Sequence, residues 1–438
     1  THLSHPLFST VDGGTVKNLR IAQSDTTLGN SSAFLCSVNK GGTLYHCEID
    51  SCTLTIRYGA SDADRHDHAL LCAMNEGGTI DSCQVKNSEI APDSSSLASI
   101  SNIGGVCALN DRGVVSRCIA EHLTINDPRQ EQGALQSVGG ICGKNFHGQL
   151  QFDTIRNSQI PLKMNLPHKF IGGICGLSGY DPVEDTDEQT YAHIPSVISD
   201  CNSDSTIINA YTHGDNDSTK KIMNIGGIVG SCQGRIIKLE RCSTMENSRI
   251  LAVADTVGGI CGRFCGEGGE SQCNTCGNNA SVTGNDYVGG IVGLMSGAQL
   301  HEGNNQGEVR SLIDFEYNSG YYAGGIAGAV VGESSLFSCN NSGTVAADSS
   351  YVGGIAGALM GESNLFLCSN HGDVSGFNQV GGLAGLILKD AWFEESTNNG
   401  LVRGIAQVGG LVGYLKSSTG NRCKLRSEEH RVGKECRS

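Results

Sequence analysis

The feature that most constrains this chain is a short unit, Gly-Gly-aliphatic-small-Gly, which recurs along most of its length. The Gly pairs begin at Gly104, Gly139, Gly172, Gly226, Gly258, Gly289, Gly324, Gly353, Gly381 and Gly409. The last three are each 28 residues apart, and the earlier intervals are longer because residues are inserted. Three degenerate copies precede them, which makes about thirteen units. A unit this small cannot bury an apolar face alone, so the units must stack on one another.

Within the later units, three short apolar segments alternate with Gly, Asn, Ser and Asp, which favour turns. Val352–Gly361, Leu365–Cys368 and Asn370–Val374 form one such unit before the cycle restarts at Val380. We therefore predict an all-β, single-domain parallel β-solenoid, a right-handed β-helix of about thirteen coils with three short strands per coil. The Gly pair is expected at a corner, where it admits positive φ or lets the backbones of adjacent coils approach closely.

We expect the solenoid to span residues 1–425, with insertion loops near 57–68, 178–196 and 213–221. Residues 426–438 fit no repeat and resemble a translated sequencing-adapter read-through, so we expect this tail to be non-native.

Composition removes several classes of protein from consideration. Gly contributes 61 of 438 residues but Pro only 7, and 38% of the chain is hydrophobic, which excludes collagen and a disordered Gly/Pro linker. A net charge of -15 argues against a nucleic-acid partner, which needs a basic face. The apolar stretches are far shorter than the roughly 20 residues that a membrane span requires.

Two strings, Leu336-Phe-Ser-Cys-Asn-Asn-Ser-Gly-Thr-Val345 and Val380-Gly-Gly-Leu-Ala-Gly385, resemble GLUG repeats. The resemblance is strong from about residue 226 to 415 and stays in register from about 5 to 225. GLUG repeats occur in bacterial and protist surface proteins, including surface regions of some IgA-cleaving metalloproteases. The resemblance implies an exported, adhesin-like protein. It transfers no catalytic residues, because the zinc motif His-Glu-x-x-His of such proteases is absent here.

The cysteines fall into two periodic columns. In the first, Cys36, Cys72 and Cys107 share a position that Val229 and Ala356 fill elsewhere, which indicates a buried apolar column rather than disulfides between coils. The second column follows the second apolar segment: Cys47, Cys83, Cys118, Cys201, Cys242, Cys276, Cys339 and Cys368. Around Cys273-Asn-Thr-Cys276, a zinc knuckle or a Cys265–Cys273 disulfide stay open as alternatives.

A periodic asparagine column is the clearest polar signal. Its members lie two residues before a position that is usually Gly: Asn278, Asn305, Asn341, Asn370 and Asn398. Stacked asparagines can hydrogen-bond along a solenoid, so we predict a structural ladder.

Candidate functional residues are few. Asp255 and Asp286 share a column, as a general acid and base of a glycan-degrading enzyme would. A weaker set for a divalent metal is Asp62, Asp64, His66, Asp67 and His68. The inserted acidic loop is a ligand-binding candidate: Asp181, Glu184, Asp185, Asp187 and Glu188. Glycosylation sequons begin at Asn30, Asn216, Asn279 and Asn340.

We therefore predict a secreted or cell-surface repeat protein that acts in adhesion, ligand binding or extracellular structure, without a cofactor. Its expected partners are an extracellular glycan, a protein surface or further copies of itself. The alternative is the glycan-degrading β-helix enzyme. A flanking column of Lys, Arg or aromatic residues is not recognisable beside the paired carboxylates, which favours the binding role.

Overall fold

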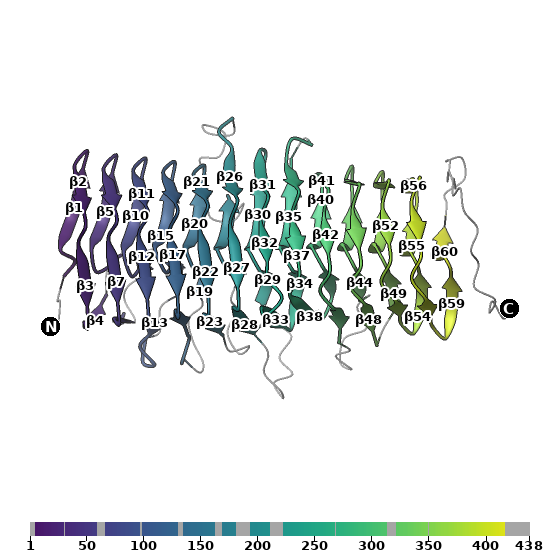
Figure 1. Ribbon diagram of the computed structural model, residues 1–438, viewed down its shortest axis with the longest axis horizontal. Coiled ribbons are helices and arrows are strands. Elements are labelled where there is room, and N and C mark those ends of the chain that lie inside the picture. The colour runs from purple at the N-terminus through teal and green to yellow at the C-terminus, as the bar shows by residue number, and fades with distance from the viewer. Residues whose placement is uncertain are drawn as a thin grey trace.

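The chain forms a straight rod of stacked coils in the computed structural model (Figure 1). The structure describes residues 5–29, 31–58, 66–96, 99–129, 135–162, 169–180, 193–210, 222–267, 269–312, 321–348 and 350–416. All sixty strands in these ranges pair in parallel within five sheets of 13, 12, 12, 12 and 11 strands, which we name A to E. The parallel β-solenoid and the thirteen coils are thus confirmed. The described residues contain no helix, and so none that could span a bilayer.

Each sheet runs along the rod and takes at most one strand from each coil, because the first and last coils are incomplete within the described residues. Sheet A contains β1 (Phe8–Asp12), β5 (Cys36–Lys40), β10 (Cys72–Glu76), β15 (Cys107–Asp111), β20 (Cys142–Phe146), β25 (Cys175–Gly179), β30 (Val229–Gly234), β35 (Cys261–Gly266), β40 (Val292–Ser296), β45 (Ala327–Val331), β50 (Ala356–Met360), β55 (Ala384–Leu388) and β60 (Val412–Lys416). Sheet B contains β2 (Thr15–Lys17), β6 (Thr43–Tyr45), β11 (Thr79–Asp81), β16 (Val114–Ser116), β21 (Gln149–Gln151), β26 (Ser196–Ser199), β31 (Ile237–Glu240), β36 (Gln272–Asn274), β41 (Gln299–His301), β46 (Ser335–Phe337), β51 (Asn364–Phe366) and β56 (Trp392–Glu394).

The other three sheets complete each coil. Sheet C contains β3 (Arg20–Ala22), β7 (Glu48–Asp50), β12 (Gln84–Lys86), β17 (Ile119–Glu121), β22 (Thr154–Arg156), β27 (Asn202–Asp204), β32 (Ser243–Thr244), β37 (Gly277–Asn278), β42 (Asn304–Asn305), β47 (Asn340–Asn341), β52 (Ser369–Asn370) and β57 (Thr397–Asn398). Sheet D contains β4 (Asp25–Leu28), β8 (Thr53–Ile56), β13 (Glu89–Pro92), β18 (Thr124–Ile125), β23 (Gln159–Pro161), β28 (Ile207–Ala210), β33 (Arg249–Ala252), β38 (Ser281–Gly284), β43 (Val309–Ser311), β48 (Val345–Ala347), β53 (Val374–Ser375) and β58 (Val402–Arg403). Sheet E contains β9 (Asp67–Ala69), β14 (Ile100–Gly104), β19 (Leu135–Gly139), β24 (Phe170–Gly172), β29 (Ile222–Gly226), β34 (Ala254–Gly258), β39 (Tyr287–Gly289), β44 (Tyr322–Gly324), β49 (Ser350–Gly353), β54 (Asn378–Gly381) and β59 (Ala406–Gly409).

A full coil therefore has five strands, and the predicted three is wrong. The Gly pair divides the first apolar segment into β49 and β50. The predicted segment Asn370–Val374 is likewise divided, between β52 and β53, and buried hydrogen bonds between coils hold β52 although asparagine has a low strand propensity.

The glycines of the repeat are required by crowding. A Cβ on Gly353 would lie closer than 3.0 Å to the carbonyl of Ala356. One on Gly354 would be equally close to the carbonyl of Gly382 in the next coil, and one on Gly357 to that of Gly328 in the preceding coil. Of the two reasons expected for the pair, the close approach of backbones is the one that applies, since neither Gly353 nor Gly354 has a positive φ.

The corner between sheets B and C has left-handed φ without glycine. Phe152 has a φ of 58° and Leu367 one of 55°, although this region costs a non-Gly residue roughly 1–2 kcal/mol. The amide of Phe152 donates to the carbonyl of Ser199 at 3.0 Å, and that of Leu367 to Glu394 at 3.2 Å. Hydrogen bonds to the next coil therefore stabilise a left-handed conformation that the residue types at this corner do not predict.

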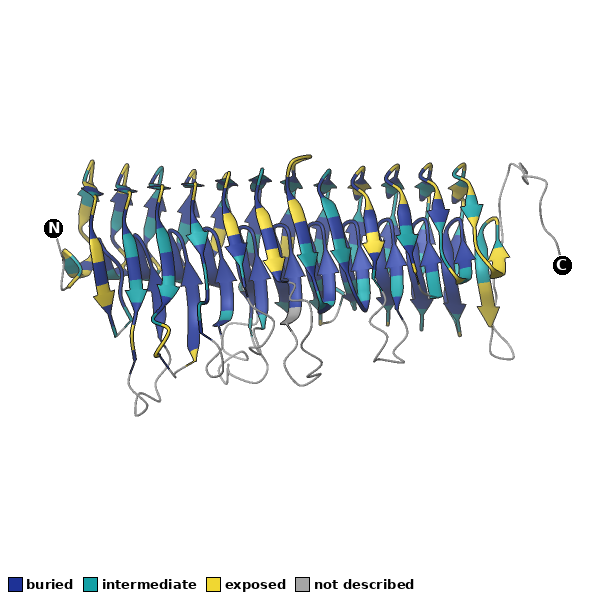
Figure 2. Ribbon diagram, turned by 90° about the horizontal axis from the view of Figure 1, so that it is seen from below, coloured by how far each residue is buried: buried dark blue, intermediate teal, exposed yellow. Residues whose placement is uncertain are grey.

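The core is a continuous apolar column inside the rod, as the alternation of buried and exposed residues along the strands in Figure 2 shows. In the middle of the short strands of sheet B, Leu300, Leu336 and Leu365 point inward and are fully buried. Their neighbours on both sides in each strand point outward, so sheet B presents two outward columns to solvent.

Candidate functional site

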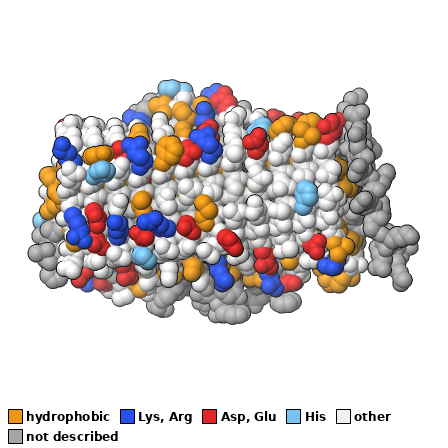
Figure 3. All heavy atoms as spheres, in the orientation of Figure 1, with side chains coloured by type: hydrophobic (Ala, Val, Ile, Leu, Met, Phe, Trp, Pro, Cys, Tyr) orange, Lys and Arg blue, Asp and Glu red, His pale blue; other side chains and the backbone are white. Residues whose placement is uncertain are grey.

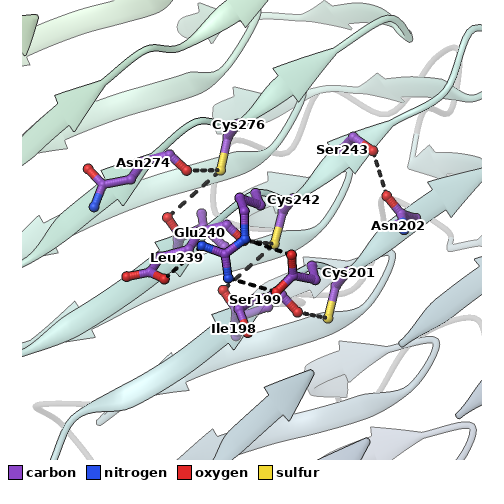
Figure 4. A network of polar contacts seen from close by, with 12 residues as sticks. Ile198, Ser199, Cys201, Asn202, Leu239, Glu240, Cys242, Ser243, Asn274 and Cys276 are labelled. Carbon is purple, nitrogen blue, oxygen red and sulfur yellow. Dashed lines mark hydrogen bonds and ion pairs between the residues drawn. The ribbon is translucent and has the colours of Figure 1, made fainter. Parts of the chain in front are cut away.

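The two predicted cysteine columns lie in the core, as expected. All eighteen cysteines in the described ranges are free thiols, and all but Cys265 are buried. In the second column each thiol donates to nearby carbonyls, for example Cys242 to Ile198 at 3.7 Å and to Glu240 at 3.4 Å (Figure 4). Burial raises the pKa of the Cys107 and Cys175 thiols well above the ordinary value, which keeps them protonated and unreactive.

The zinc and disulfide alternatives at Cys273 and Cys276 gain no support. Both side chains are buried, and Cys265 accepts a hydrogen bond from the Arg263 guanidinium at 3.1 Å. No group of three metal-ligating side chains occurs among the described residues.

The predicted asparagine ladder is confirmed. Each amide nitrogen donates to the amide oxygen in the next coil, from Asn278 through Asn305, Asn341 and Asn370 to Asn398, always at 2.8 Å. Each also donates to a backbone carbonyl two residues later. A second ladder in sheet A, which the sequence analysis missed, is marked by Asn three residues before Gly: Asn39, Asn75, Asn110 and Asn145.

One acidic residue interrupts the second cysteine column. Asp153 lies between Cys118 and Cys201 of the adjacent coils and is fully buried. One oxygen, Oδ1, accepts the Cys118 amide at 2.8 Å, and Oδ2 is buried without a hydrogen-bond partner. Burial raises the pKa of this carboxyl well above its ordinary value.

The candidate catalytic pair occupies equivalent positions in adjacent coils. Thr256 pairs with Tyr287, so Asp255 and Asp286 each lie one residue before a paired position of sheet E. Asp255 is partly exposed and Asp286 is 8% exposed.

An aromatic column lies beside these carboxylates, contrary to the sequence analysis. Tyr287, Tyr322 and Tyr351 stack with centroids 5.1 and 5.0 Å apart and pack on Ala329, Ala358 and Leu386 of sheet A. Burial raises the pKa of Tyr287, and the charges of Asp286 and Asp255 raise it further, while Arg263 opposes them. The signal was a tyrosine two residues before three successive Gly pairs.

The histidines of the candidate metal site are part of a buried cluster at the start of β9. His68 is fully buried, its Nε2 lies 2.5 Å from the Tyr58 hydroxyl, and His66 stacks on the Tyr58 ring at 3.8 Å. Burial, with a smaller contribution from His66, lowers the pKa of His68 to about 3. Asp67 accepts from Asn102 at 2.7 Å. Asp62 and Asp64 lie outside the described residues, so the full ligand set stays a prediction.

Several other candidates also lie outside the described residues. These are the acidic loop of Asp181, Glu184, Asp185, Asp187 and Glu188, the sequons at Asn30 and Asn216, and the tail 426–438. Asn279 and Asn340 are described and partly exposed, and Asn340 accepts from Ser369 at 3.0 Å.

The outward face of sheets B and C changes character along the rod. Over the N-terminal coils, charged side chains pair with each other between coils. Examples are Arg156 with Glu121 at 3.0 Å and Arg241 with Asp200 at 2.7 Å. In the column that holds Asp81 and Glu240 in these coils, the next four coils carry Asn274, His301, Phe337 and Phe366, and Glu394 follows them. Figure 3 shows charge over the N-terminal coils, at left, and a broad uncharged band over the C-terminal coils.

Comparisons with known proteins do not assign this chain to a family. No protein-family model matches the chain, and no curated protein does. Among solved structures, one similar chain is HetL, a pentapeptide repeat protein involved in heterocyst differentiation regulation from the cyanobacterium Nostoc sp. strain PCC 7120. The alignment has 8% identity, covers 53% of this chain and 83% of that one, and has a TM-score of 0.12.

Proposed function

We propose that this chain is a secreted or cell-surface rod that binds an extended partner, in adhesion or in an extracellular layer. One observation carries the proposal. Outward side chains repeat in register over consecutive coils, as Phe337 and Phe366 do in one column and Asn304 and Asn340 in another. Such repetition matches a partner that is itself extended, because the same contact is offered once per coil.

The proposed location and partners have separate support. The repeats resemble GLUG units of surface proteins, which favours export and a glycan, a protein surface or further copies of the chain as partner. The thiols are compatible with an oxidising compartment because they are buried from soluble oxidants.

A binding screen tests this function. The purified chain is applied to a glycan array and, in parallel, to immobilised extracellular-matrix proteins, and its self-association is followed by sedimentation. Saturable binding in one of the three assays is expected. Absence of binding in all three assays would indicate an inert spacer and refute the proposal.

The enzyme alternative has gained one supporting feature, the tyrosine column beside Asp255 and Asp286. Asp286→Asn and Asp255→Asn are the variants to test, with Asp12→Asn, an exposed residue of the first coil, as the control. Release of soluble sugar by the wild-type chain and the control, and not by the first two variants, would establish the enzyme over the binding rod.

A further inference from the structure

Six outward residues of three adjacent coils form a neutral surface that we name the amide–aromatic strip: Gln299, His301, Phe337, Asn340, Asn364 and Phe366. They come from four strands: β41, β46 and β51 pair directly in sheet B, and β47 follows β46 along the chain in sheet C. Each is partly exposed, while Leu300, Leu336 and Leu365 beneath them are fully buried. The core is therefore complete without the aromatic rings of the strip, and their position at the surface needs another reason.

The aromatic rings of the strip do not cover one another by parallel stacking. The His301 and Phe337 centroids are 5.5 Å apart with the planes tilted by 48°, and Phe337 and Phe366 are 5.4 Å apart with a tilt of 30°. By contrast, Tyr287 and Tyr322 lie within 8° of parallel and pack against sheet A. The strip thus leaves aromatic surface turned to solvent, and the neighbouring Leu367 is 41% exposed.

The amide groups of the strip are positioned but not saturated. Asn364 Nδ2 donates to Ser335 Oγ at 3.0 Å, Gln299 Oε1 lies 3.2 Å from His301 Nε2, and the Asn340 oxygen accepts from Ser369. An amide has two donor hydrogens and two acceptor lone pairs, so each of these side chains can bond a further group. The Asn340 oxygen also lies 3.1 Å from His371 Nδ1. One or two bonds therefore hold each of these amides at the surface in a fixed orientation, which lowers the entropic cost of binding.

Charge decides which polar ligand suits the strip. It contains no Lys or Arg, and the nearest charged residues along the same columns and corner are Glu302, Glu394 and Glu395. An acidic polysaccharide or a nucleic acid would be repelled by these carboxylates and would find no cation. A neutral ligand with hydroxyl groups on its edges and C–H groups on its faces would use both the amides and the rings.

We propose that the amide–aromatic strip binds a neutral, extended polysaccharide of β-linked pyranoses, which lies along the rod axis. Adjacent coils are about 4.8 Å apart, comparable with the advance of one sugar in such a chain, so successive sugars meet successive coils. The pyranose faces pack on Phe337 and Phe366, and the hydroxyls bond Gln299, Asn340 and Asn364. This inference rests on the proposed binding function and names the ligand class and the surface.

The single tryptophan provides the readout. Trp392 lies in the outward column of sheet B next to Asn364 and is partly exposed, so a bound chain that extends one coil further alters its fluorescence. Cellohexaose and xylohexaose are the neutral probes, and hexagalacturonate is the acidic control. Calorimetry gives the affinity independently of the fluorescence change.

The variants use residues that the same column already contains. Phe337→Asn and Phe366→Asn copy Asn274, which occupies this column in β36, so the fold tolerates the change. The matched control is Tyr45→Asn, an aromatic residue of the same column among the charged coils. We expect the double variant to lose at least tenfold in affinity for a neutral hexasaccharide, and Tyr45→Asn to bind as the wild type does.

Two results would overturn the inference and leave the binding function standing. They are unchanged affinity in the double variant, or binding of hexagalacturonate or of a protein in preference to both neutral probes. Absence of any ligand in the wider screen is the different result that refutes the binding function itself.

Discussion

Replacing Asp153 by serine tests the energetics of the core most directly. Ser396 occupies the equivalent position near the C-terminal end, and its hydroxyl accepts the Cys368 amide at 3.0 Å, as Asp153 Oδ1 accepts that of Cys118. Asp153→Ser therefore keeps the hydrogen bond and removes the buried carboxyl oxygen that lacks a partner.

The sign of the pH dependence follows from the raised pKa of Asp153. In the unfolded chain the carboxyl ionises near pH 4, whereas in the folded chain it stays protonated to a much higher pH. Its contribution to stability is thus fully present below pH 4 and is lost as the pH rises toward the folded pKa. The loss is about 1.4 kcal/mol per pH unit, or up to about 4 kcal/mol between pH 4.5 and 7.5.

Urea denaturation at several pH values between 4.5 and 7.5 measures this effect. The difference in unfolding free energy between Asp153→Ser and the wild type should grow with pH by up to about 4 kcal/mol. Asp12→Ser, at an exposed position, is the control and should follow the wild type. Amide exchange at Cys118 locates the effect in its coil, since coils of a solenoid open locally. Parallel pH profiles for Asp153→Ser and the wild type would show that the folded carboxyl is ionised, contrary to the reasoning.

Three further predictions concern the ladders, the corners and the thiols. Asn305→Ala removes the ladder bonds to Asn278 Nδ2 and Asn341 Oδ1, and the loss of these two buried bonds should cost about 2–5 kcal/mol in urea denaturation, whereas the exposed Asn304→Ala should stay within about 0.5 kcal/mol; similar losses would show that the ladder is not stabilising. Gly354→Ala places a Cβ against the Gly382 carbonyl and should lower the thermal midpoint more than Gly410→Ala, which meets nothing within 4 Å; equal midpoints would contradict the crowding argument. The buried thiols, such as Cys107 and Cys339, should resist a maleimide in the native chain and react in denaturant, as counted by mass spectrometry; rapid native labelling would refute their burial.

The repeat was sufficient to predict the register of the coils. Once Gly353, Gly381 and Gly409 are aligned, the residues between them align too, which correctly placed the inward cysteine and asparagine columns. The strand count was not predictable in the same way. The corner at Leu367 has no glycine to mark it, and the bond that holds it comes from the next coil.

The candidate sites were harder to predict than the fold because they depend on contacts between different faces. The shared column of Asp255 and Asp286 was visible in the sequence, but the tyrosine column beside them was not recognised. His66, Asp67 and His68 suggested metal ligands because alternating polar residues look the same whether they face solvent or a buried tyrosine.

The amino-acid sequence by itself determined that thirteen similar units stack in parallel, because periodic glycines and small residues are compatible only with closely stacked backbones. Only the tertiary structure decided which outward columns are charged and paired and which form the neutral amide–aromatic strip. Whether Arg241 meets Asp200, or Phe337 meets Phe366, depends on side chains 41 and 29 residues apart becoming neighbours at the coil spacing. That proximity is a property of the stacked rod and not of any single unit.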